Sequence, residues 1–230
     1  MFKPEYVERV DFMGGDLTVC IAARVSFSKQ TTWENITDED GYCIDRVLSE
    51  RDGKLVNYLA KHGHISPFFH PMITLRIKMP IFVARQWYKS QIGFARNEVS
   101  RRYVSDEPEF WIPTEWRMAA KDKKQGSSDE VRTDSELGFT YGFVRNLINE
   151  SVSVYNCLID EGVAPEMARM ILPQSMMTSF VETASLAAYA RLVKLRTTSD
   201  AQQEIRDYAN RVSEIMAELF PVSWKALMEH

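Results

Sequence analysis

The feature that most restricts the fold of this chain is a change of hydrophobic period around Pro80. Apolar and polar residues alternate in residues 72–79 (MITLRIKM), which is the two-residue period of a strand with one buried face. Pro80 then stands where a helix can begin, and IFVARQWYKS continues at helical spacing. Strands are expected early in the chain and helices late, which predicts an α+β domain and not the βαβ alternation of a Rossmann fold.

Turn residues and periodicity divide the rest of the chain. Residues 7–12 and 17–21 are expected to form two strands around the Gly14-Gly15 turn. Residues 28–53 and 104–135 are polar and aperiodic, so each is expected to be a long loop. Helices are expected at about residues 54–62, 137–160, 165–172, 183–195 and 200–219, and Pro221 should end the last one. Residues 1–230 are expected to form a single domain.

Composition excludes several classes of protein. With 45% hydrophobic and 26% charged residues, the chain is neither disordered, collagenous nor a disulfide scaffold. A net charge of −4 argues against a nucleic-acid-binding protein. No apolar run has the length of a signal peptide or a membrane span. The three scattered cysteines form no CxxC pair and fit a reducing compartment, so a cytoplasmic protein that binds no membrane is expected.

Positive charge is concentrated in residues 85–102. Five basic residues and one acidic residue give this segment a charge of +4, so the rest of the chain carries −8. Its second half contains NEVSRRY, which combines an amide, a carboxylate, a hydroxyl and two guanidinium groups. These groups suit a site for a pyrimidine edge and a phosphate, because guanidinium binds phosphate oxygens in a bidentate fork. We therefore expect an anionic ligand at this segment.

Other polar residues have two interpretations. Arg85, Gln86 and Lys89 can share one side of the helix after Pro80, either as a ligand surface or as a solvated polar face. Arg196 ends a largely apolar helix, where it either complements the helix dipole or binds a ligand. Arg169 lies next to an apolar Met-Ile-Leu run, and a guanidinium among apolar residues normally has an anionic partner.

Three of the four histidines lie close together, at His62, His64 and His70. A metal site is one interpretation, but no carboxylate stands at the usual offset, and Pro67 and Pro71 break the helix that would align the ligands. We therefore expect no metal. The histidines either form hydrogen bonds within a turn or line a ligand pocket.

In chain order, several motifs resemble those of the flavin-dependent thymidylate synthase family, usually called ThyX. The matching segments are DFMGGDLTVCIAARVSF, LVNYLAKHGHISPFFH, PIFVARQW, NEVSRRY, EMARMILP and an LR segment followed by AQQEI. They cover about two thirds of the chain, and the two polar stretches lie outside them. NEVSRRY about a dozen residues after ARQW, with EMARMILP downstream, is a specific combination.

This resemblance implies a fold, an assembly and a reaction. The fold is a ThyX-like single α+β domain with a mainly antiparallel sheet packed against several helices. The assembly is a homotetramer with active sites between subunits. The reaction is methylation of deoxyuridine monophosphate (dUMP) to thymidine monophosphate (dTMP) for thymidylate biosynthesis. FAD is the implied cofactor, and methylenetetrahydrofolate and NADPH are the implied co-substrates.

The resemblance also assigns site residues by position. The implied dUMP-binding residues are Gln86, Lys89, Glu98, Ser100, Arg101, Arg102, Arg169 and Arg196. The implied FAD-binding residues are Ser26, Ser66, Lys89, Ser90, Gln91, Ile92, Asn97, Glu98 and Arg191. His64 and Tyr103 fall near the pocket that folate and nicotinamide share in the family.

Departures from the family pattern are concentrated on the flavin side. Lys89, Ser90 and Gln91 stand where the family has Arg-His-Arg, and lysine lacks the planar fork of arginine. The glutamates usual in the histidine-rich turn are absent, and Ile65 and Phe69 replace them. Further replacements relative to the family are Ser185, Ala187, Arg191 and Asp200.

Methylation at C5 of uracil requires a nucleophilic C5, produced either by adding a thiolate at C6 or by stabilising negative charge on the pyrimidine carbonyls. None of Cys20, Cys43 and Cys157 has the setting of an activated nucleophile. The electrostatic route remains, with Arg196 and Lys89 as the candidate catalytic residues. Three hypotheses stay open: thymidylate synthesis, altered chemistry on the same fold (hydroxymethyl transfer or another pyrimidine acceptor), and a non-catalytic nucleotide-binding relative.

Overall fold

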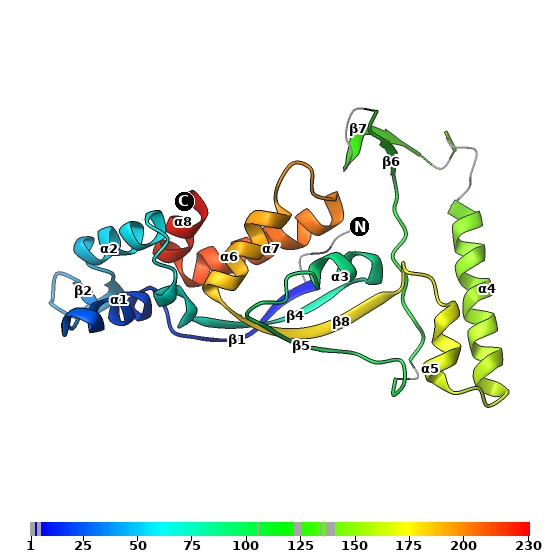
Figure 1. Ribbon diagram of the computed structural model, residues 1–230, viewed down its shortest axis with the longest axis horizontal. Coiled ribbons are helices and arrows are strands. Elements are labelled where there is room, and N and C mark those ends of the chain that lie inside the picture. Colours follow the sequence, from blue (N-terminus) through cyan, green and yellow to red (C-terminus); the bar gives the residue numbers. More distant parts are fainter. Residues whose placement is uncertain (1–2, 4–5, 105, 122–125, 134, 137–140) are drawn as a thin grey trace.

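A four-stranded antiparallel sheet lies at the centre of the structure (Figure 1). The computed structural model describes residues 3, 6–104, 106–121, 126–133, 135–136 and 141–230. The strand order is β1-β4-β8-β5. The strands are β1 (Val7–Met13), β4 (Met72–Pro80), β8 (Met177–Ser185) and β5 (Phe94–Glu98).

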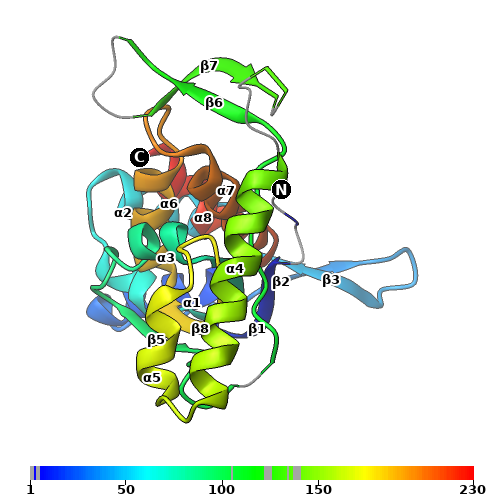
Figure 2. The ribbon, with the colours of Figure 1, turned by 90° about the vertical axis from the view of Figure 1, so that its right-hand side faces the viewer.

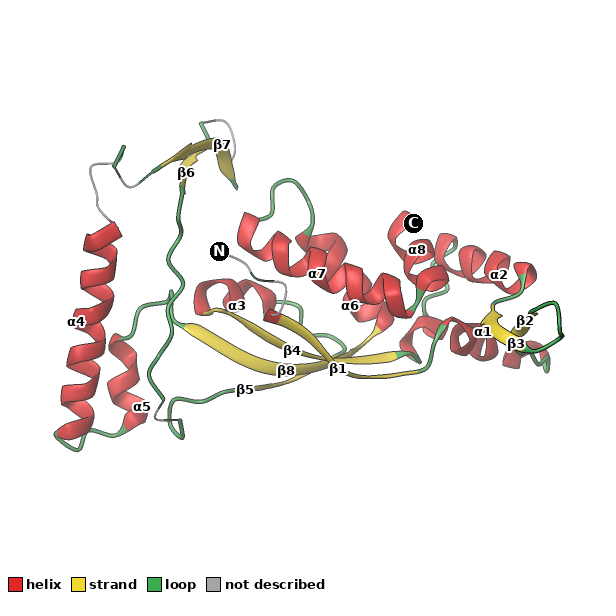
Figure 3. Cartoon of the chain, turned by 180° about the vertical axis from the view of Figure 1, so that it is seen from behind, coloured by secondary structure: helices red, strands yellow, loops and turns green. Residues whose placement is uncertain are grey.

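One face of this sheet is covered by helices (Figures 1 and 3). The covering helices are α3 (Ile81–Trp87), α6 (Leu186–Arg196) and α7 (Gln203–Leu219). The alternation predicted for residues 72–79 is confirmed, because Ile73, Leu75 and Ile77 are fully buried in the hydrophobic core. On the other face, the hydroxyl of Thr74 lies 2.9 Å from that of Thr183 on the neighbouring strand. The expected α+β fold, a mainly antiparallel sheet packed against helices, is confirmed.

Three more helices and a hairpin form one end of the molecule (Figure 3). They are α1 (Asp16–Arg24), α2 (Glu50–Lys61), α8 (Pro221–Glu229) and the strands β2 (Glu34–Thr37) and β3 (Cys43–Val47). The carboxylate of Asp16 accepts hydrogen bonds from the backbone N–H groups of Val222 (3.0 Å) and Ser223 (2.8 Å), at the start of α8. This contact attaches the beginning of α1 to the last helix.

The opposite end holds a second hairpin and a helical pair (Figures 1 and 2). The hairpin consists of β6 (Trp116–Ala119) and β7 (Ser127–Arg132), and the pair of α4 (Tyr141–Asp160) and α5 (Pro165–Ala168), followed by a short 3₁₀ turn, η4 (Arg169–Ile171). None of the helices in the described ranges is both long and apolar enough to cross a membrane.

The predicted strand at residues 17–21 is wrong, because these residues belong to α1. Gly14 has a φ of +81°, and the Thr18 hydroxyl accepts a hydrogen bond from the Gly15 N–H (3.0 Å). This contact satisfies a donor at the helix start, so the Gly-Gly pair begins a helix and does not close a hairpin. Val19 and Cys20 are both fully buried, which a strand exposed on one face would not allow.

The two predicted loops are also corrected, since residues 28–53 contain the β2–β3 hairpin and the start of α2, and residues 104–135 contain β6 and β7. The strands of both hairpins are half-exposed or exposed, so they lack the alternation that would reveal them. The helix expected at 183–195 begins only at Leu186, and the sequence pattern predicts neither β5 nor β8. The helix predicted at 137–160 is α4, although residues 137–140 lie outside the described residues.

A buried ion pair joins the sheet to α3. Glu182 on β8 is 0% exposed and accepts a hydrogen bond from Arg96 Nε on β5 (2.6 Å) and from Trp87 Nε1 on α3 (3.1 Å). Burial raises the pKa of Glu182, and the attraction of the Arg96 guanidinium for the carboxylate opposes that rise. Arg96 also stacks over the Phe94 ring at 4.4 Å and donates to the Ser90 carbonyl at 2.6 Å. Arg96 therefore has a structural partner and is not available to a ligand.

Replacing Arg96 with alanine should lower the free energy of unfolding by about 3–5 kcal/mol at neutral pH, because it leaves the Glu182 carboxylate buried without a cation. Urea denaturation measures this loss. The loss should shrink as the pH falls and Glu182 takes up a proton, since a buried acid with a raised pKa stabilises the fold in its neutral form.

Arg76→Ala is the matched control for this prediction. It removes the exposed ion pair of Arg76 with Glu8 on the same sheet, and it should cost less than about 1 kcal/mol. Equal losses for the two variants would contradict the structural role of the buried pair.

Candidate active site

Gln86 and Arg196 line the same hollow, which has a volume of about 590 Å³. Gln86 lies in α3 and Arg196 is the last residue of α6. The Gln86 side-chain amide donates to Gln202 Oε1, just before α7. The structure therefore brings together two of the sequence-predicted nucleotide residues that are 110 positions apart in the chain.

The guanidinium of Arg196 is only partly satisfied inside this hollow. Its Nη2 donates to the Gln86 carbonyl oxygen at 2.7 Å, whereas its Nε is buried and has no hydrogen-bond partner. No carboxylate of the described residues forms an ion pair with it. Burial lowers the pKa of Arg196, because the charged form loses solvation. A partly buried cation without a carboxylate partner among the described residues suits an anionic or carbonyl-bearing ligand.

Lys89 lies just beyond the end of α3, in a turn. Helix α3 ends at Trp87, so the expectation that the helix continues through Lys89 is wrong. Its backbone N–H donates to the Gln86 carbonyl at 3.2 Å, and this oxygen also accepts from Arg196. The Lys89 side chain is exposed. It lines neither the Gln86–Arg196 hollow nor the hollow that Glu98, Arg101 and Arg169 line where β5 ends.

A second hollow, of about 340 Å³, lies where β5 ends. Glu98, Arg101 and Arg169 line it, together with Thr178 of β8. The Thr178 hydroxyl donates to Glu98 Oε1 at 2.5 Å, which fixes that carboxylate. Three further sequence-predicted residues therefore meet at a site that shares no lining residue with the Gln86–Arg196 hollow.

The other residues of NEVSRRY form a turn next to the second hollow. The Ser100 hydroxyl accepts from the Arg102 backbone N–H at 3.3 Å. The guanidinium of Arg102 lies over the Tyr103 ring at 5.1 Å, and both side chains are exposed. Arg101 donates to the Asp106 carbonyl. The charged ends of Arg101 and Arg102 are held by neutral groups, so they keep a net positive field at this turn.

Arg169 differs from the environment predicted for it. The prediction placed it among apolar residues with an anionic partner, but its side chain is exposed and its Nε donates only weakly, at 3.4 Å, to the Glu166 carbonyl. Met170 beside it is also exposed. A solvated arginine needs no partner, so its position on the second hollow is the remaining argument for ligand binding.

The flavin residues implied by the resemblance centre on the turn between α3 and β5. The Ser90 carbonyl accepts from Arg96, and the Ile92 carbonyl accepts from the Arg191 guanidinium of α6. Ile92 is 78% exposed, with Lys89 and Gln91 exposed beside it. Gly93 has a φ of +84°, and a Cβ there would lie 3.2 Å from the Ala188 Cβ, so the turn packs tightly on α6. An exposed apolar side chain flanked by Lys89 and Arg191 fits a cofactor with an aromatic ring and phosphates.

Other sequence-predicted residues lie along the same structure. Ser26 follows α1 in a short 3₁₀ turn, and Ser66 begins another such turn, η3 (Ser66–Phe69), which packs against α1 and α6. Asn97 is exposed on β5. His64 stacks with Tyr58 at a ring distance of 6.1 Å. Ser66 precedes β4, and Phe94 begins β5 at the same end of the sheet, so Ser66 and Ile92 lie toward one end.

Metal ligation and thiol chemistry find little support in the side chains. Among the described residues, no three His, Cys, Asp or Glu side chains gather as metal ligands, and the His62 ring packs at a tilt against Tyr58, with the ring centroids 4.3 Å apart. Burial, followed by the Asp52 carboxylate, raises the pKa of Cys20 to about 12. Cys43 and Cys157 are exposed on β3 and α4 and line neither nucleotide hollow. A neutral, buried Cys20 cannot act as a nucleophile.

Three contributors to these hollows carry no clear signal in the sequence. Thr178 lies on β8, a strand that the sequence pattern does not predict, and Arg117 lies in a segment expected to be a loop. Gln202 belongs to the AQQEI segment, but nothing in that segment indicates which of its amides reaches Gln86. Only the long-range pairing of β8 and the position of the β6–β7 hairpin reveal these residues.

Comparisons with known proteins show the family to which the chain belongs. Residues 9–222 match the family described as "Thymidylate synthase complementing protein". A flavin-dependent thymidylate synthase from Thermus thermophilus is 36% identical over 225 residues, covering 98% of this chain and 76% of that protein. The enzyme of the same name from Thermosipho africanus is 35% identical, covering 97% of this chain and 91% of that protein. The chain belongs to the flavin-dependent thymidylate synthase (ThyX) family.

Solved structures add a second kind of relative. The UMP/dUMP methylase PolB from Streptomyces cacaoi, bound with 5-Br dUMP, has a TM-score of 0.79 and 28% sequence identity. The match covers 97% of this chain and 94% of that one. The same protein bound with 5-Br UMP also has a TM-score of 0.79, at 27% identity. A relative described as acting on both UMP and dUMP bears on the choice of acceptor.

Proposed function

We propose that this chain methylates dUMP at C5 to give dTMP, with methylenetetrahydrofolate as carbon donor, FAD as cofactor and NADPH as reductant. The observation that carries the proposal is Arg196, a partly buried cation without a carboxylate partner among the described residues. It lines a hollow beside the amide groups of Gln86 and Gln202. Membership of the flavin-dependent thymidylate synthase family supplies the reaction that such a site performs.

The residues support an electrostatic route to a nucleophilic C5. Negative charge that develops on a uracil carbonyl during attack would be stabilised by the positive charge of the Arg196 guanidinium, which lines the hollow. Gln86 would orient the base through its side-chain amide, which can both donate and accept. A thiolate route has no candidate in Cys20, whose raised pKa keeps it protonated at neutral pH. The exposed Lys89 side chain lines neither hollow, so it would act on the base only through its longer-range positive charge.

The second hollow suits the phosphate of the nucleotide. Arg101 and Arg169 line it, and Arg102 lies in the adjoining turn beside Ser100. Guanidinium groups match phosphate geometry through two parallel N–H donors. Glu98, held by Thr178, would accept a hydrogen bond from the base or the ribose. The resemblance implies these roles, and the fold leaves the residues concerned accessible to a ligand.

The separation of the two hollows supports a homotetramer with active sites between subunits, which the resemblance implies. They share no lining residue, so a nucleotide that needs both sets of groups would be bound by two copies of the chain. Helix α4 also exposes large apolar side chains, with Phe143 66% exposed and Leu147 62% exposed. Apolar surface of this kind on an outlying helix is typical of a protein interface.

Flavin would be held at the turn between α3 and β5. Lys89 and Arg191 would face its phosphates and Ile92 its ring, and the Ser26 and Ser66 hydroxyls are further candidates. Arg191 is an arginine that this chain has in place of the family's usual asparagine, and it supplies a guanidinium close to the turn that lacks the Arg-His-Arg triplet. When bound, a reduced flavin supplies the hydride that completes the methyl group. His64 and Tyr103 are the candidates for the folate and nicotinamide pocket.

UMP is a second candidate acceptor for the same reaction. The structural relative PolB is described as a UMP/dUMP methylase and has been solved with both 5-bromo nucleotides. Choice between ribose and deoxyribose depends on contacts at the 2′ position. If the contacts at the 2′ position admit a hydroxyl, this site would accept UMP as well as dUMP, and the carbon chemistry would be the same.

Product analysis tests the proposal directly. The purified protein should convert dUMP to a product about 14 mass units heavier when FAD, methylenetetrahydrofolate and NADPH are present, because one CH₂ is added. Parallel incubation with UMP measures the acceptor preference. A hydroxymethyl product, or binding of dUMP with no product under any combination of co-substrates, would instead establish one of the two alternative hypotheses.

Arg196→Ala should weaken dUMP binding by about 2–5 kcal/mol, because the variant removes a partly buried charge that pairs with the ligand. Isothermal titration calorimetry measures the loss. Lys194→Ala is the matched control, since Lys194 is an exposed cation on the same last turn of α6. Wild-type affinity in Arg196→Ala would leave Arg196 as a helix-end charge only.

Arg191→Ala should weaken FAD binding about tenfold or more, because it removes a guanidinium beside the turn that carries Lys89 and Ile92. Titration of the apoprotein, followed by flavin absorbance and fluorescence, measures this affinity. Arg211→Ala, which removes a half-buried arginine that pairs with the exposed Glu214 on α7, should bind FAD as the wild type does. If both variants bind FAD equally well, the flavin is held without Arg191.

A further inference from the structure

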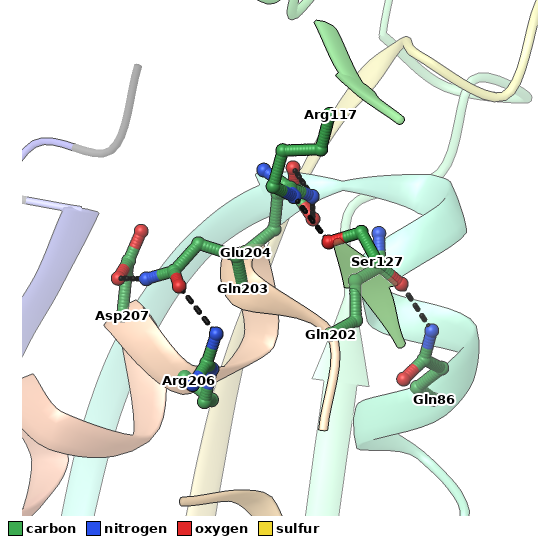
Figure 4. A network of polar contacts seen from close by, with 8 residues as sticks. All are labelled: Gln86, Arg117, Ser127, Gln202, Gln203, Glu204, Arg206 and Asp207. Atoms are coloured by element: carbon green, nitrogen blue, oxygen red, sulfur yellow. Dashed lines mark hydrogen bonds and ion pairs between the residues drawn. The ribbon is translucent and has the colours of Figure 1, made fainter. Parts of the chain in front are cut away.

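The β6–β7 hairpin has no role in the function proposed above, yet it lies beside the Gln86–Arg196 hollow. Figure 4 shows the polar contacts that connect it to the helices. The walls of the hollow come from both parts: Arg117, Gly126 and Ser127 from the hairpin segment, and Gln86, Arg196 and Gln202 from the helical layer. Without the hairpin, the Gln86–Arg196 surface would lack this wall.

Arg117 attaches the hairpin to α7. Its Nη2 donates to both carboxylate oxygens of Glu204, at 2.6 and 2.8 Å, and its Nε donates to the Ser127 hydroxyl at 3.0 Å (Figure 4). One guanidinium thereby fixes both strands of the hairpin and the start of α7. The pair is partly buried, with Arg117 29% and Glu204 11% exposed, so it contributes more to the stability of the fold than a surface ion pair does.

The helical side of this contact is held by its own interactions. Glu204 lies in the first turn of α7, where the helix dipole favours a carboxylate. Next to it, Gln203 donates to Asp207 at 2.7 Å and accepts from Arg206 at 2.5 Å (Figure 4). These contacts fix the first turn of α7, so Glu204 is a prearranged partner that the hairpin joins through Arg117.

Close backbone packing places the hairpin at the rim of the hollow. Gly126 has a φ of +89°, and a Cβ at this position would lie 3.5 Å from the Asp200 carbonyl oxygen. Asp200 and Gln202 belong to the connection between α6 and α7 and line the same hollow. The first residues of β7 therefore approach the segment that positions Gln202, the hydrogen-bond partner of Gln86.

From this geometry we infer that Arg117 is a positioning residue for the nucleotide site: its ion pair with Glu204 holds the β6–β7 hairpin against α7, so that Ser127 closes the Gln86–Arg196 hollow over a bound pyrimidine nucleotide. The inference rests on the proposed function, since it takes that nucleotide as the ligand. Because this wall is in place before the nucleotide binds, less conformational entropy is lost on binding. The wall also excludes water from the Arg196 guanidinium.

Full-length variants carrying FAD test this role. Arg117→Ala should raise the Kd and the KM for dUMP about tenfold, the size expected for coupling within one ion-pair network, and should change kcat by less than about twofold. The charge-reversed double variant, Arg117→Glu with Glu204→Arg, should recover most of the affinity. If Arg117→Ala does not fold, Glu204→Gln removes only the charge of the ion pair, and the Kd and KM of that variant for dUMP are measured instead.

Arg132→Ala is the control on the same hairpin. Arg132 pairs with Glu130 within β7, both are exposed, and this variant should bind dUMP as the wild type does. Thermal unfolding separates stability from binding. A lower midpoint for Arg117→Ala with unchanged dUMP affinity would overturn the inference, and so would a failure of the charge-reversed pair to regain affinity.

Arg196→Ala shows which proposal has failed. If Arg196→Ala loses dUMP affinity while Arg117→Ala keeps it, the hairpin inference is wrong and the proposed function stands. If Arg196→Ala binds dUMP normally, the Gln86–Arg196 hollow is not the nucleotide site and the hairpin inference is overturned, whereas the proposed reaction is decided by the product analysis.

Discussion

The ion pair of Glu182 with Arg96 is the interaction on which the ligand-binding surfaces depend. A carboxylate that is fully buried in the central strand loses its hydration, and only close donors compensate for that loss. Arg96 supplies one from β5 and Trp87 another from α3, so three elements are fixed around one side chain. Gln86 precedes Trp87 directly, and Arg96 also holds the Ser90 carbonyl. The Gln86–Arg196 hollow and the turn between α3 and β5 thus share one buried anchor.

Local patterns predict those parts of the fold whose burial follows a simple period. Strand β4 is predictable because its faces differ, with Ile73 and Leu75 buried and Arg76 exposed. Strand β8 is not, because it continues directly into α6 and carries Glu182, which a local pattern assigns to a polar face. The same limit applies to the site. Glu98 and Arg101 are close in sequence, whereas the meeting of Gln86 with Arg196 depends on how α6 crosses α3.

Two different principles support the two sides of the candidate active site. On the proposed nucleotide side, arginines from separate elements line the hollows, and they are held mainly by neutral groups that leave their positive charge unbalanced. On the flavin side, this chain lacks the Arg-His-Arg triplet typical of its family, and a tight turn presents Lys89 and Ile92 beside Arg191. The positive charge of Arg191 on α6 then lies near the positions where the family has the triplet. This arrangement keeps a positive electrostatic field at the turn, although the individual contacts of the triplet are absent.

The Gln86 carbonyl oxygen accepts from two donors, the Arg196 guanidinium and the Lys89 backbone N–H. The group proposed to act on the base and the first residue of the flavin turn therefore rest on a single acceptor. Any shift of the turn changes the direction in which that oxygen points, and the guanidinium must follow. If flavin binds at this turn as proposed, its occupancy and the alignment of Arg196 would be thermodynamically linked, and the linkage would work equally in both directions.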